Sequence, residues 1–446
     1  MEVEKTLAQM TLEDKIALCS GANFWETKRF EPYGIPSVFM CDGPHGLRKQ
    51  EEAADMLGVN RAHPATCFPA EVTTAASWDP VLLEQIGAAI AEEAREQDVD
   101  LVLGPGANLK RNPLCGRSFE YFSEDPLLAG KLAAGFICGA EAKGVGTSLK
   151  HLAANSQETC RFTSDSVLDE RALREMYLTA FEIAVREGKP STVMCAYPKL
   201  NGIHCSDHQE LLTGILRSEW GFDGLVLTDW GAMNNRIEGF RAGCDLSMPG
   251  GSNFMEKEVL EAVKTGKLPQ KAVDASARRV LELVSRAAEK PKTETSCDYQ
   301  AHHVLAKEAA EQGAVLLHNK DNILPLREGT KIGAMAKSMR FQGAGSSHIN
   351  PKRLSQPLSF LPHAVYAPGC DERGDTTDVL LAEAIQAAKE AQIAVVFAGL
   401  PDRYESEGFD RENMRMPEGH LRMIDAVARA NANIVVVLLC GCAAAR

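Results

Sequence analysis

The sequence lacks any apolar run long enough to cross a membrane. Its longest one, residues 434–440, is far shorter than the roughly 20 residues that a transmembrane helix needs. The N-terminal residues are acidic and polar, without the basic start and apolar stretch of a signal peptide. These absences exclude a membrane-spanning protein and predict a cytoplasmic one.

Concentrated positive charge is also absent. The formal net charge is −13, and no dense run of lysine and arginine occurs, which argues against a nucleic-acid partner. The segment GPGANL at 104–109 lacks the third glycine of a dinucleotide fingerprint, and no phosphate-binding loop or GxSxG motif is present. We therefore expect no cofactor.

A metal site and a disulfide framework are not expected either. His204 and His208 are four residues apart, but Pro198 and Gly202 place them in a loop rather than on a helix face. The 13 cysteines are an odd number, are scattered and form no CxxC pair. This usage predicts reduced thiols in a cytosolic protein.

What is present is a soluble α/β pattern long enough for two or three domains: 446 residues, 45% of them apolar. The first 290 residues or so alternate short apolar strands with amphipathic helices. The predicted strands are 37–41, 99–103, 147–149, 192–196, 225–228 and 245–247. Helices are expected after Asp79–Pro80 and Asp125–Pro126, and over 169–187.

Repeated strand–helix units imply parallel strands, arranged as a (β/α)8 TIM-like barrel or as a doubly wound sheet. Polar residues follow the strands, and barrel enzymes place their chemistry there, so we favour a barrel over 1–288. Residues 289–299 are predicted to be a linker. A second α/β domain is expected over 300–446, with strands at 314–317, 332–336, 394–398 and 434–439 and a helix at 378–391.

The chain stops shortly after its last apolar strand. A central strand this hydrophobic normally precedes a covering helix. We therefore expect the second domain to be incomplete and the chain to be shortened at its C-terminus, with 434–439 as an uncovered edge.

Three strand ends carry side chains suited to catalysis. In GLVLTDWGA, Asp229 ends a strand and precedes Trp230, so it is a candidate nucleophile, base or metal ligand beside an aromatic that suits a sugar ring. SLKHLAAN places the hydrogen-bond donors Lys150 and His151 together, and CDGPHGLR places Asp42 and Arg48 around a tight turn. A helix-capping aspartate, a core histidine and a structural turn are the alternatives.

Two loops are also rich in charge. RNPLCGRSFEYFSEDP includes Arg117 among aromatics and acids, and YESEGFDR in the second domain is acidic. A loop braced by ion pairs and a solvated loop explain these patterns equally well on residues alone.

Taken together, and in this order along the chain, these segments with MCAYPKLNG and GAGSSHI resemble glycoside hydrolase family 3. The resemblance implies a barrel followed by an α/β sandwich, an active site between them and a retaining mechanism without cofactor or metal. It implies Asp229 as nucleophile and Glu407 as acid/base. The residues that the resemblance assigns to sugar binding are Asp42, Arg48, Arg117, Lys150, His151, Tyr197, Trp230 and Ser346.

Retaining hydrolysis needs two carboxyl groups about 5–5.5 Å apart, one ionised and one protonated. We expect Lys150 and Arg117 to keep Asp229 ionised, and less compensated burial to keep Glu407 protonated.

The predicted function is release of terminal β-D-glucose from short β-glucosides. β-Xylosidase or α-arabinofuranosidase activity is the alternative within the family, and an inactive sugar-binding fragment is the alternative outside catalysis. The N-acetylglucosaminidase branch is disfavoured because the chain has KHLAANS rather than a KHFPGHG-like segment. A small carbohydrate is the expected partner, and homo-oligomerisation is left open.

Overall fold

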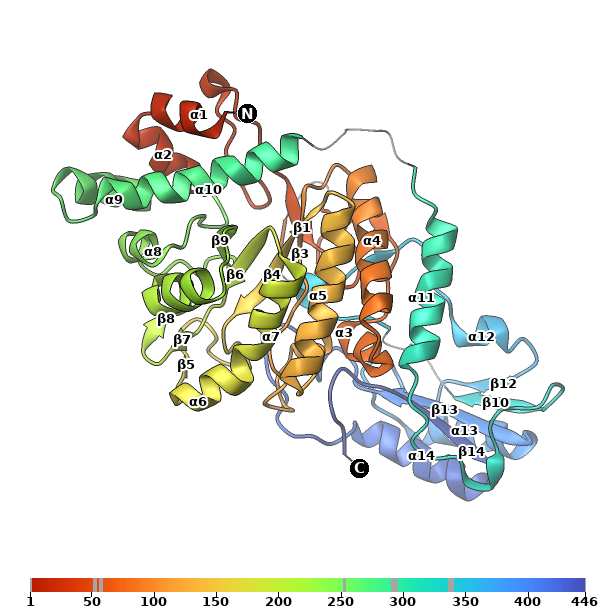
Figure 1. Ribbon diagram of the computed structural model, residues 1–446. Coiled ribbons are helices and arrows are strands. Elements are labelled where there is room, and N and C mark those ends of the chain that lie inside the picture. The colour runs from red at the N-terminus through yellow and green to blue at the C-terminus, as the bar shows by residue number, and fades with distance from the viewer. Residues whose placement is uncertain are drawn as a thin grey trace.

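The computed structural model describes residues 2–50, 54–55, 59–251, 254–289, 296–335 and 341–445. It contains two main parallel sheets, one in the red-to-green half of the chain and one in the blue part, each covered by helices (Figure 1). This α/β architecture with two separate parallel sheets agrees with the predicted fold class.

The first sheet is parallel and has the strand order β1-β3-β4-β6-β9. Every side chain of these five strands is buried, as expected for parallel strands covered on both faces. The strands are β1 Met40–Asp42, β3 Leu101–Leu103, β4 Gly146–Leu152, β6 Thr192–Cys195 and β9 Leu225–Thr228.

Isolated bridges extend this sheet from β9 back to β1. Leu227 bridges Leu246, and the adjacent Ser247 bridges Ser20. The 20–27 segment then folds on itself and reaches Phe39, next to β1, through Glu26. The sheet therefore closes into a TIM-like barrel, although the predicted strand at 245–247 contributes only bridge residues.

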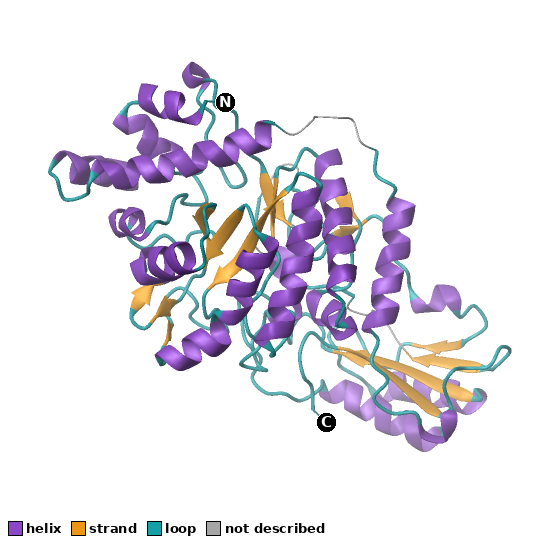
Figure 2. Cartoon of the chain, viewed as in Figure 1, coloured by secondary structure: helices purple, strands orange, loops and turns teal. Residues whose placement is uncertain are grey.

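The helices of this half surround the barrel, and α4, α5 and α7 lie together on one side of the sheet (Figure 2). They begin where the sequence predicts: Asp79 caps α4 by accepting from Val81 N, and Asp125 caps α5 by accepting from Leu127 N. The helices are α1 Val3–Gln9, α2 Leu12–Leu18, α3 Glu71–Thr74, α4 Pro80–Glu96, α5 Pro126–Ala142, α6 Glu170–Ala172, α7 Thr179–Ile183, α8 Arg236–Ala242, α9 Phe254–Lys264 and α10 Gln270–Ala288.

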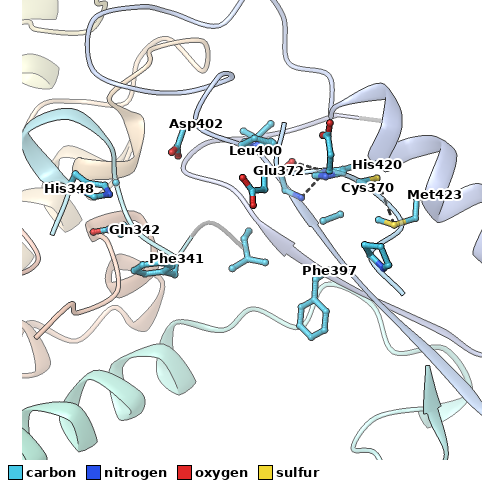
Figure 3. Close-up of a pocket in the computed structure, with 17 residues that line it drawn as sticks. Phe341, Gln342, His348, Cys370, Glu372, Phe397, Leu400, Asp402, His420 and Met423 are labelled. Atoms are coloured by element: carbon cyan, nitrogen blue, oxygen red, sulfur yellow. Dashed lines mark hydrogen bonds between the residues drawn. The ribbon is translucent and has the colours of Figure 1, made fainter. Parts of the chain in front are cut away.

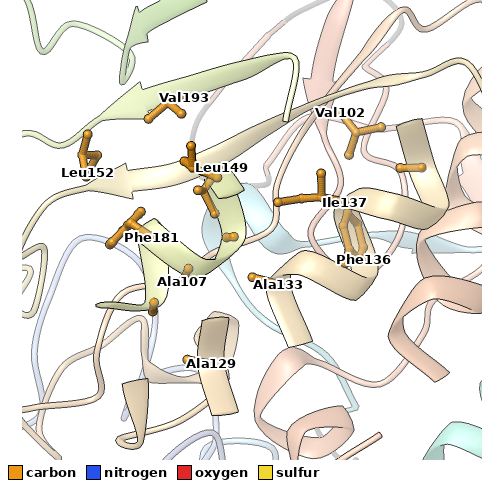
Figure 4. Close-up of a cluster of buried hydrophobic side chains, with 14 of the residues drawn as sticks. Val102, Ala107, Ala129, Ala133, Phe136, Ile137, Leu149, Leu152, Phe181 and Val193 are labelled. Carbon is orange, nitrogen blue, oxygen red and sulfur yellow. The ribbon is translucent and has the colours of Figure 1, made fainter. Parts of the chain in front are cut away.

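The predicted helix at 169–187 exists, but it alternates α and π turns before it ends at Gly188. Between α5 and the sheet lies the main apolar core, in which Phe136 and Ile137 of α5 face Leu149 and Val102 of the strands (Figure 4). Among the described residues, no helix combines the length and apolar character needed to cross a membrane.

The second sheet is parallel, with the order β12-β10-β13-β14. Its strands are β12 Val365–Ala367, β10 Ile332–Met335, β13 Ile393–Gly399 and β14 Ile434–Leu439, and its main helices are α13 Asp378–Glu390 and α14 Glu418–Ala430. The short helix α12 spans Pro357–Phe360. The predicted strands at 332–336, 394–398 and 434–439 are confirmed over their described residues.

The predicted strand at 314–317 is wrong. These residues form no strand, and Val315, Leu316 and Leu317 are 64%, 64% and 80% exposed. An apolar run becomes a strand only where a neighbouring strand pairs with it, and the described residues supply none at this position.

Short two-residue strands complete the chain. β5 Asp165–Ser166, β7 Lys199–Leu200 and β8 Ile203–His204 form a small sheet of their own. β2 Pro64–Ala65 pairs in parallel with β11 Asn350–Pro351, so a segment that follows β10 is tied to the barrel side of the molecule.

The helix α11, Tyr299–Gly313, lies beside α4 at the boundary between the two sheets (Figure 1). Most of the predicted linker, 290–295, lies outside the described residues, and its last residue already belongs to α11. His302 fixes this helix: its Nδ1 lies 2.8 Å from Glu93 Oε1 and its Nε2 lies 3.1 Å from Glu92 Oε2. Burial alone would lower the pKa of His302, but the two glutamates outweigh it and raise that pKa.

His302→Gln is expected to cost stability in a pH-dependent way. Because the folded-state pKa is raised, the stabilisation is fully present below about pH 6.5 and is lost as pH rises through the folded value. Chemical unfolding of parent and variant from pH 5.5 to 8.5 measures this. His303→Gln is the control, and an equal cost of His302→Gln at every pH would contradict the expectation.

Candidate active site

The strand ends of the barrel bring the predicted residues together. Asp42 is the last residue of β1, Lys150 and His151 lie in β4, and Asp229 follows β9 directly. Because parallel strands carry their carboxyl ends to the same side, side chains from distant parts of the sequence meet there. Hydrogen bonds and ion pairs link seven of the ten predicted site residues into one set and the other three, Asp42, Arg48 and Lys150, into a second.

The two carboxylate oxygens of Asp229 differ in their hydrogen bonding. Its Oδ1 accepts the Trp230 N–H at 2.8 Å, whereas Oδ2 is buried and has no hydrogen-bond partner among the described residues. Burial raises the pKa of Asp229 above its ordinary value, and Arg117 and Arg161 offset this only in part. An oxygen without a donor is the one suited to attack.

His151 lies 3.6 Å from Asp229, measured between Nε2 and Oδ2. Burial and the positive charges of Arg117 and Lys150 hold its pKa well below the ordinary value, so the ring is neutral. Arg117 Nη2 lies 3.1 Å from Nε2 and donates to it, which leaves Nδ1 protonated toward the Tyr121 hydroxyl at 3.2 Å. The Nε2 of His151 therefore does not neutralise Asp229.

Asp42, Arg48 and Lys150 form a second buried group. Arg48 Nη1 donates to Asp42 Oδ2 at 3.0 Å, and Lys150 Nζ lies 4.0 Å from Asp42 Oδ1. Burial raises the pKa of Asp42 to about 6 despite both cations. Buried charges that retain capacity for further hydrogen bonds suit the hydroxyl groups of a sugar.

Tyr197 and Trp230 form the aromatic side of the site. The Tyr197 hydroxyl donates to Trp230 O at 3.0 Å, and Trp230 Nε1 donates to Phe24 O at 2.8 Å. Trp230 is only 5% exposed, because it packs against Trp25 with ring centroids 5.7 Å apart. Stacking of Trp230 on a sugar stays a prediction.

Glu407 reaches the barrel from the loop after β13. Its Oε2 accepts the Ser346 N–H at 2.8 Å, its Oε1 accepts from Arg161 Nη1 at 2.8 Å, and Arg117 Nη1 lies 3.7 Å from Oε1. Burial opposes ionisation of this carboxyl, but Arg117, Arg161 and Ser346 outweigh it and lower its pKa to about 2.

We expected nearby cations to keep Asp229 ionised and burial to keep Glu407 protonated. The pKa shifts of these two carboxyls have the opposite directions, so this expectation is wrong. Burial dominates at Asp229 and raises its pKa, whereas two guanidinium groups dominate at Glu407 and lower its pKa. Lys150, which we expected to act on Asp229, instead lies beside Asp42. At Glu407, Arg161, which the sequence did not indicate, adds to the effect of Arg117.

Arg161 and Glu158 are the site residues that sequence reasoning missed. Arg161 is 8% exposed, contacts Glu158 and Glu407 through Nη1, and lies 4.5 Å from the Tyr197 ring centroid. They follow SLKHLAAN in a stretch without helical or strand periodicity. The only available signal was a cluster of charges after a strand.

Asp410 joins the loop of Glu407 to the barrel. Its carboxylate accepts the backbone N–H groups of Gly116, Glu158 and Thr159 at 2.8–3.1 Å. Gly116 also allows close approach, since a Cβ there would lie 1.8 Å from Phe409 O. A side chain at 116 is thus incompatible with this docking.

A cavity of about 300 Å³ lies at the carboxyl ends of β13 and β14. Figure 3 shows His348, Gln342 and Phe341 on one side of it and Glu372 and Leu400 on the other. None of the ten predicted residues lines it. Elsewhere in the described part of the chain, no group of three or more His, Cys, Asp or Glu is placed to hold a metal ion.

Two family profiles match the chain. The glycosyl hydrolase family 3 N-terminal domain matches residues 28–283, and the glycosyl hydrolase family 3 C-terminal domain matches residues 314–445. The two matches lie on the barrel half and on the half with the second sheet.

Curated relatives are similar over almost the whole chain. The chain is 50% identical to thermostable beta-glucosidase B of Acetivibrio thermocellus, over 99% of this chain and 60% of that protein. It is 42% identical to the exo-alpha-(1->6)-L-arabinopyranosidase of Bifidobacterium longum, over 97% and 59%. The chain thus spans about 60% of the length of these relatives.

Solved structures share the fold. The GH3 beta-glucosidase of Bifidobacterium adolescentis superposes with a TM-score of 0.91 at 41% identity, covering 98% of this chain and 64% of that one. Beta-glucosidase 3B of Thermotoga neapolitana in complex with glucose gives 0.89 at 32% identity, covering 100% and 70%.

Proposed function

This chain belongs to glycosyl hydrolase family 3, and on that premise we propose that it is a retaining β-glucosidase. It releases terminal β-D-glucose from short β-glucosides through a covalent glycosyl-enzyme intermediate. The observation that carries the proposal is the buried Asp229, whose Oδ2 has no hydrogen-bond partner among the described residues and whose pKa is raised in part by the charge of a second buried carboxyl, Glu407.

In this mechanism Asp229 Oδ2 attacks the anomeric carbon while Glu407 protonates the leaving oxygen. Water then attacks the glycosyl-enzyme, and Glu407 takes the proton that the water loses. Arg117 stabilises negative charge on both carboxyls, because it lies 3.7 Å from Glu407 and lowers the pKa of Asp229. Asp42, Arg48, Lys150 and His151 bind the sugar hydroxyls.

A second candidate is α-L-arabinopyranosidase activity, favoured by the 42% identity to the Bifidobacterium longum enzyme. An α-L-arabinopyranoside has the ring of a β-D-galactoside without its C6 group. A site for hexoses can therefore accept it at the cost of the contacts to that group. Xylose, the sugar of the β-xylosidase alternative, differs from glucose in the same region. Arabinofuranose, the sugar of the α-arabinofuranosidase alternative, differs from glucose in ring size.

Hydrolysis of p-nitrophenyl glycosides tests the proposal. The panel comprises the β-glucoside, β-xyloside, α-L-arabinofuranoside and α-L-arabinopyranoside. We expect the highest kcat/KM on the β-glucoside, with retention of configuration seen by NMR of the first product. A folded chain that binds glucose but hydrolyses no substrate would establish the inactive sugar-binding alternative instead.

We also propose the division into a barrel over 1–288, a linker over 289–299 and a second domain over 300–446 that contributes Glu407. The two family matches, at 28–283 and 314–445, support this division. A cytoplasmic location is likewise our inference. It is supported by the 13 cysteines, which are odd in number and scattered along the sequence.

A further inference from the structure

Two buried carboxyl groups share one guanidinium nitrogen in the candidate active site. Arg161 Nη1 donates to Glu158 Oε2 at 2.9 Å and to Glu407 Oε1 at 2.8 Å. Glu158 is 3% exposed and Glu407 is 7% exposed. Glu158 Oε2 also accepts the Gly408 N–H at 2.8 Å, so this side chain contacts the loop that carries Glu407.

The contacts of the two carboxyls differ in a way that separates their protonation. Both Glu407 oxygens have partners, whereas Glu158 Oε1 is buried and has no hydrogen-bond partner among the described residues. A buried carboxylate oxygen without a donor is costly, and protonation removes the cost. Burial accordingly raises the pKa of Glu158 to about 7, although Arg117 and Arg161 oppose it.

Proximity of like charges acts in the same direction. Two carboxylates around one cation repel each other, so a proton taken up by either one favours ionisation of the other. The titratable and charged groups that face Glu158 come from three segments of the chain. They are Cys115, Arg117, Tyr121, Arg161, Glu407 and Asp410.

We propose that Glu158 and Glu407 form a coupled carboxyl pair that holds one proton, with Glu158 as a positioning residue that keeps this proton in the site until Glu407 delivers it. The proposal rests on the proposed glycosidase function and deepens it. It explains how Glu407 acts as an acid although two guanidinium groups favour its ionised form.

The proton balance of the step is simple. The O–H bond on Glu158 breaks and one forms on Glu407, so that Glu158 becomes the carboxylate that pairs with Arg161. Glu407 then transfers the proton to the glycosidic oxygen as the bond to the anomeric carbon breaks and Asp229 Oδ2 forms its bond. In the second half-reaction Glu407 takes a proton from the attacking water, and the pair regains it.

The pH dependence of kcat/KM in Glu158→Gln tests the pair. Without the second carboxyl, Arg161 acts on Glu407 alone, so the basic limb of kcat/KM for methyl β-glucoside is expected to move at least about one pH unit lower. The rate on 2,4-dinitrophenyl β-glucoside, whose leaving group needs no acid, should stay within about threefold.

Two further variants complete the comparison. Glu158→Asp keeps the carboxyl and should keep the basic limb of the parent. Glu124→Gln removes an exposed carboxyl from a neighbouring loop and should leave the rates on both substrates unchanged. A basic limb of Glu158→Gln that coincides with that of the parent, or equal losses on both substrates, would overturn the proposal.

A carboxyl titration of the parent decides the question independently of turnover. With ¹³C-labelled glutamate side chains, NMR should show a buried carboxyl that titrates near neutral pH, with a lower midpoint in Glu407→Gln because the neighbouring charge is gone. Absence of such a signal rejects the pair even if Glu158→Gln does not fold. An inactive parent that shows the signal would reject the glycosidase function and leave the pair standing.

Discussion

Asp229→Asn should lower kcat/KM on the β-glucoside by on the order of 10⁴-fold, which corresponds to about 5.5 kcal/mol of transition-state stabilisation. The amide retains the shape of the carboxylate and still accepts the Trp230 N–H, but it cannot form the glycosyl ester. The protein should remain folded, since the change adds no volume and removes a charge from a buried position. Initial rates and circular dichroism measure the two effects.

The matched control is Asp223→Asn, which makes the same change at an exposed position on the chain entering β9. It should behave as the parent. A 2-deoxy-2-fluoroglucoside with a good leaving group should label the parent on the peptide that contains Asp229, as seen by mass spectrometry. Label on another carboxyl would assign the nucleophile elsewhere.

Glu407→Ala is the second change with a large expected effect. Glycosylation should slow by about 10²- to 10⁴-fold for alkyl glucosides and cellobiose, which need a proton on the leaving oxygen. Substrates with dinitrophenyl leaving groups should lose far less in that step. Azide should restore turnover and yield β-glucosyl azide, because a small anion attacks the intermediate without needing a base.

Glu412→Ala, an exposed acid on the same loop, serves as the control. The leaving-group series and the azide dependence are read from initial rates. Uniform loss over all leaving groups, with no effect of azide, would show that Glu407 supports the structure rather than the proton transfer.

Local signals in the sequence were enough to place the five strands of the barrel sheet, but not to show that 245–247 contributes only bridge residues. Asp79 and Asp125 cap α4 and α5 as their position before proline indicates. The strand-end residues meet because parallel strands share a direction. The strand expected at 314–317 failed because apolar character alone does not supply a pairing partner.

The electrostatics of the site were beyond sequence reasoning. The pKa of a buried carboxyl depends on the sum of its burial and the charges around it, and that sum needs coordinates. Arg161 meets Glu407 across 246 residues of sequence and no periodic pattern marks it. The ten residues named from the sequence stay predictions as site residues, and Arg161, which helps to lower the pKa of Glu407, was not among them.

The docking of Asp410 and Gly116 has a consequence for biosynthesis. Asp229 leaves the ribosome 407 − 229 = 178 residues before Glu407, which at ordinary rates of protein synthesis is roughly 10 to 40 s. During that interval the nascent barrel has the proposed nucleophile but not the proposed proton donor. On the proposed mechanism it cannot cleave glucosides whose leaving group needs a proton until the loop that carries Glu407 has emerged and docked on Gly116.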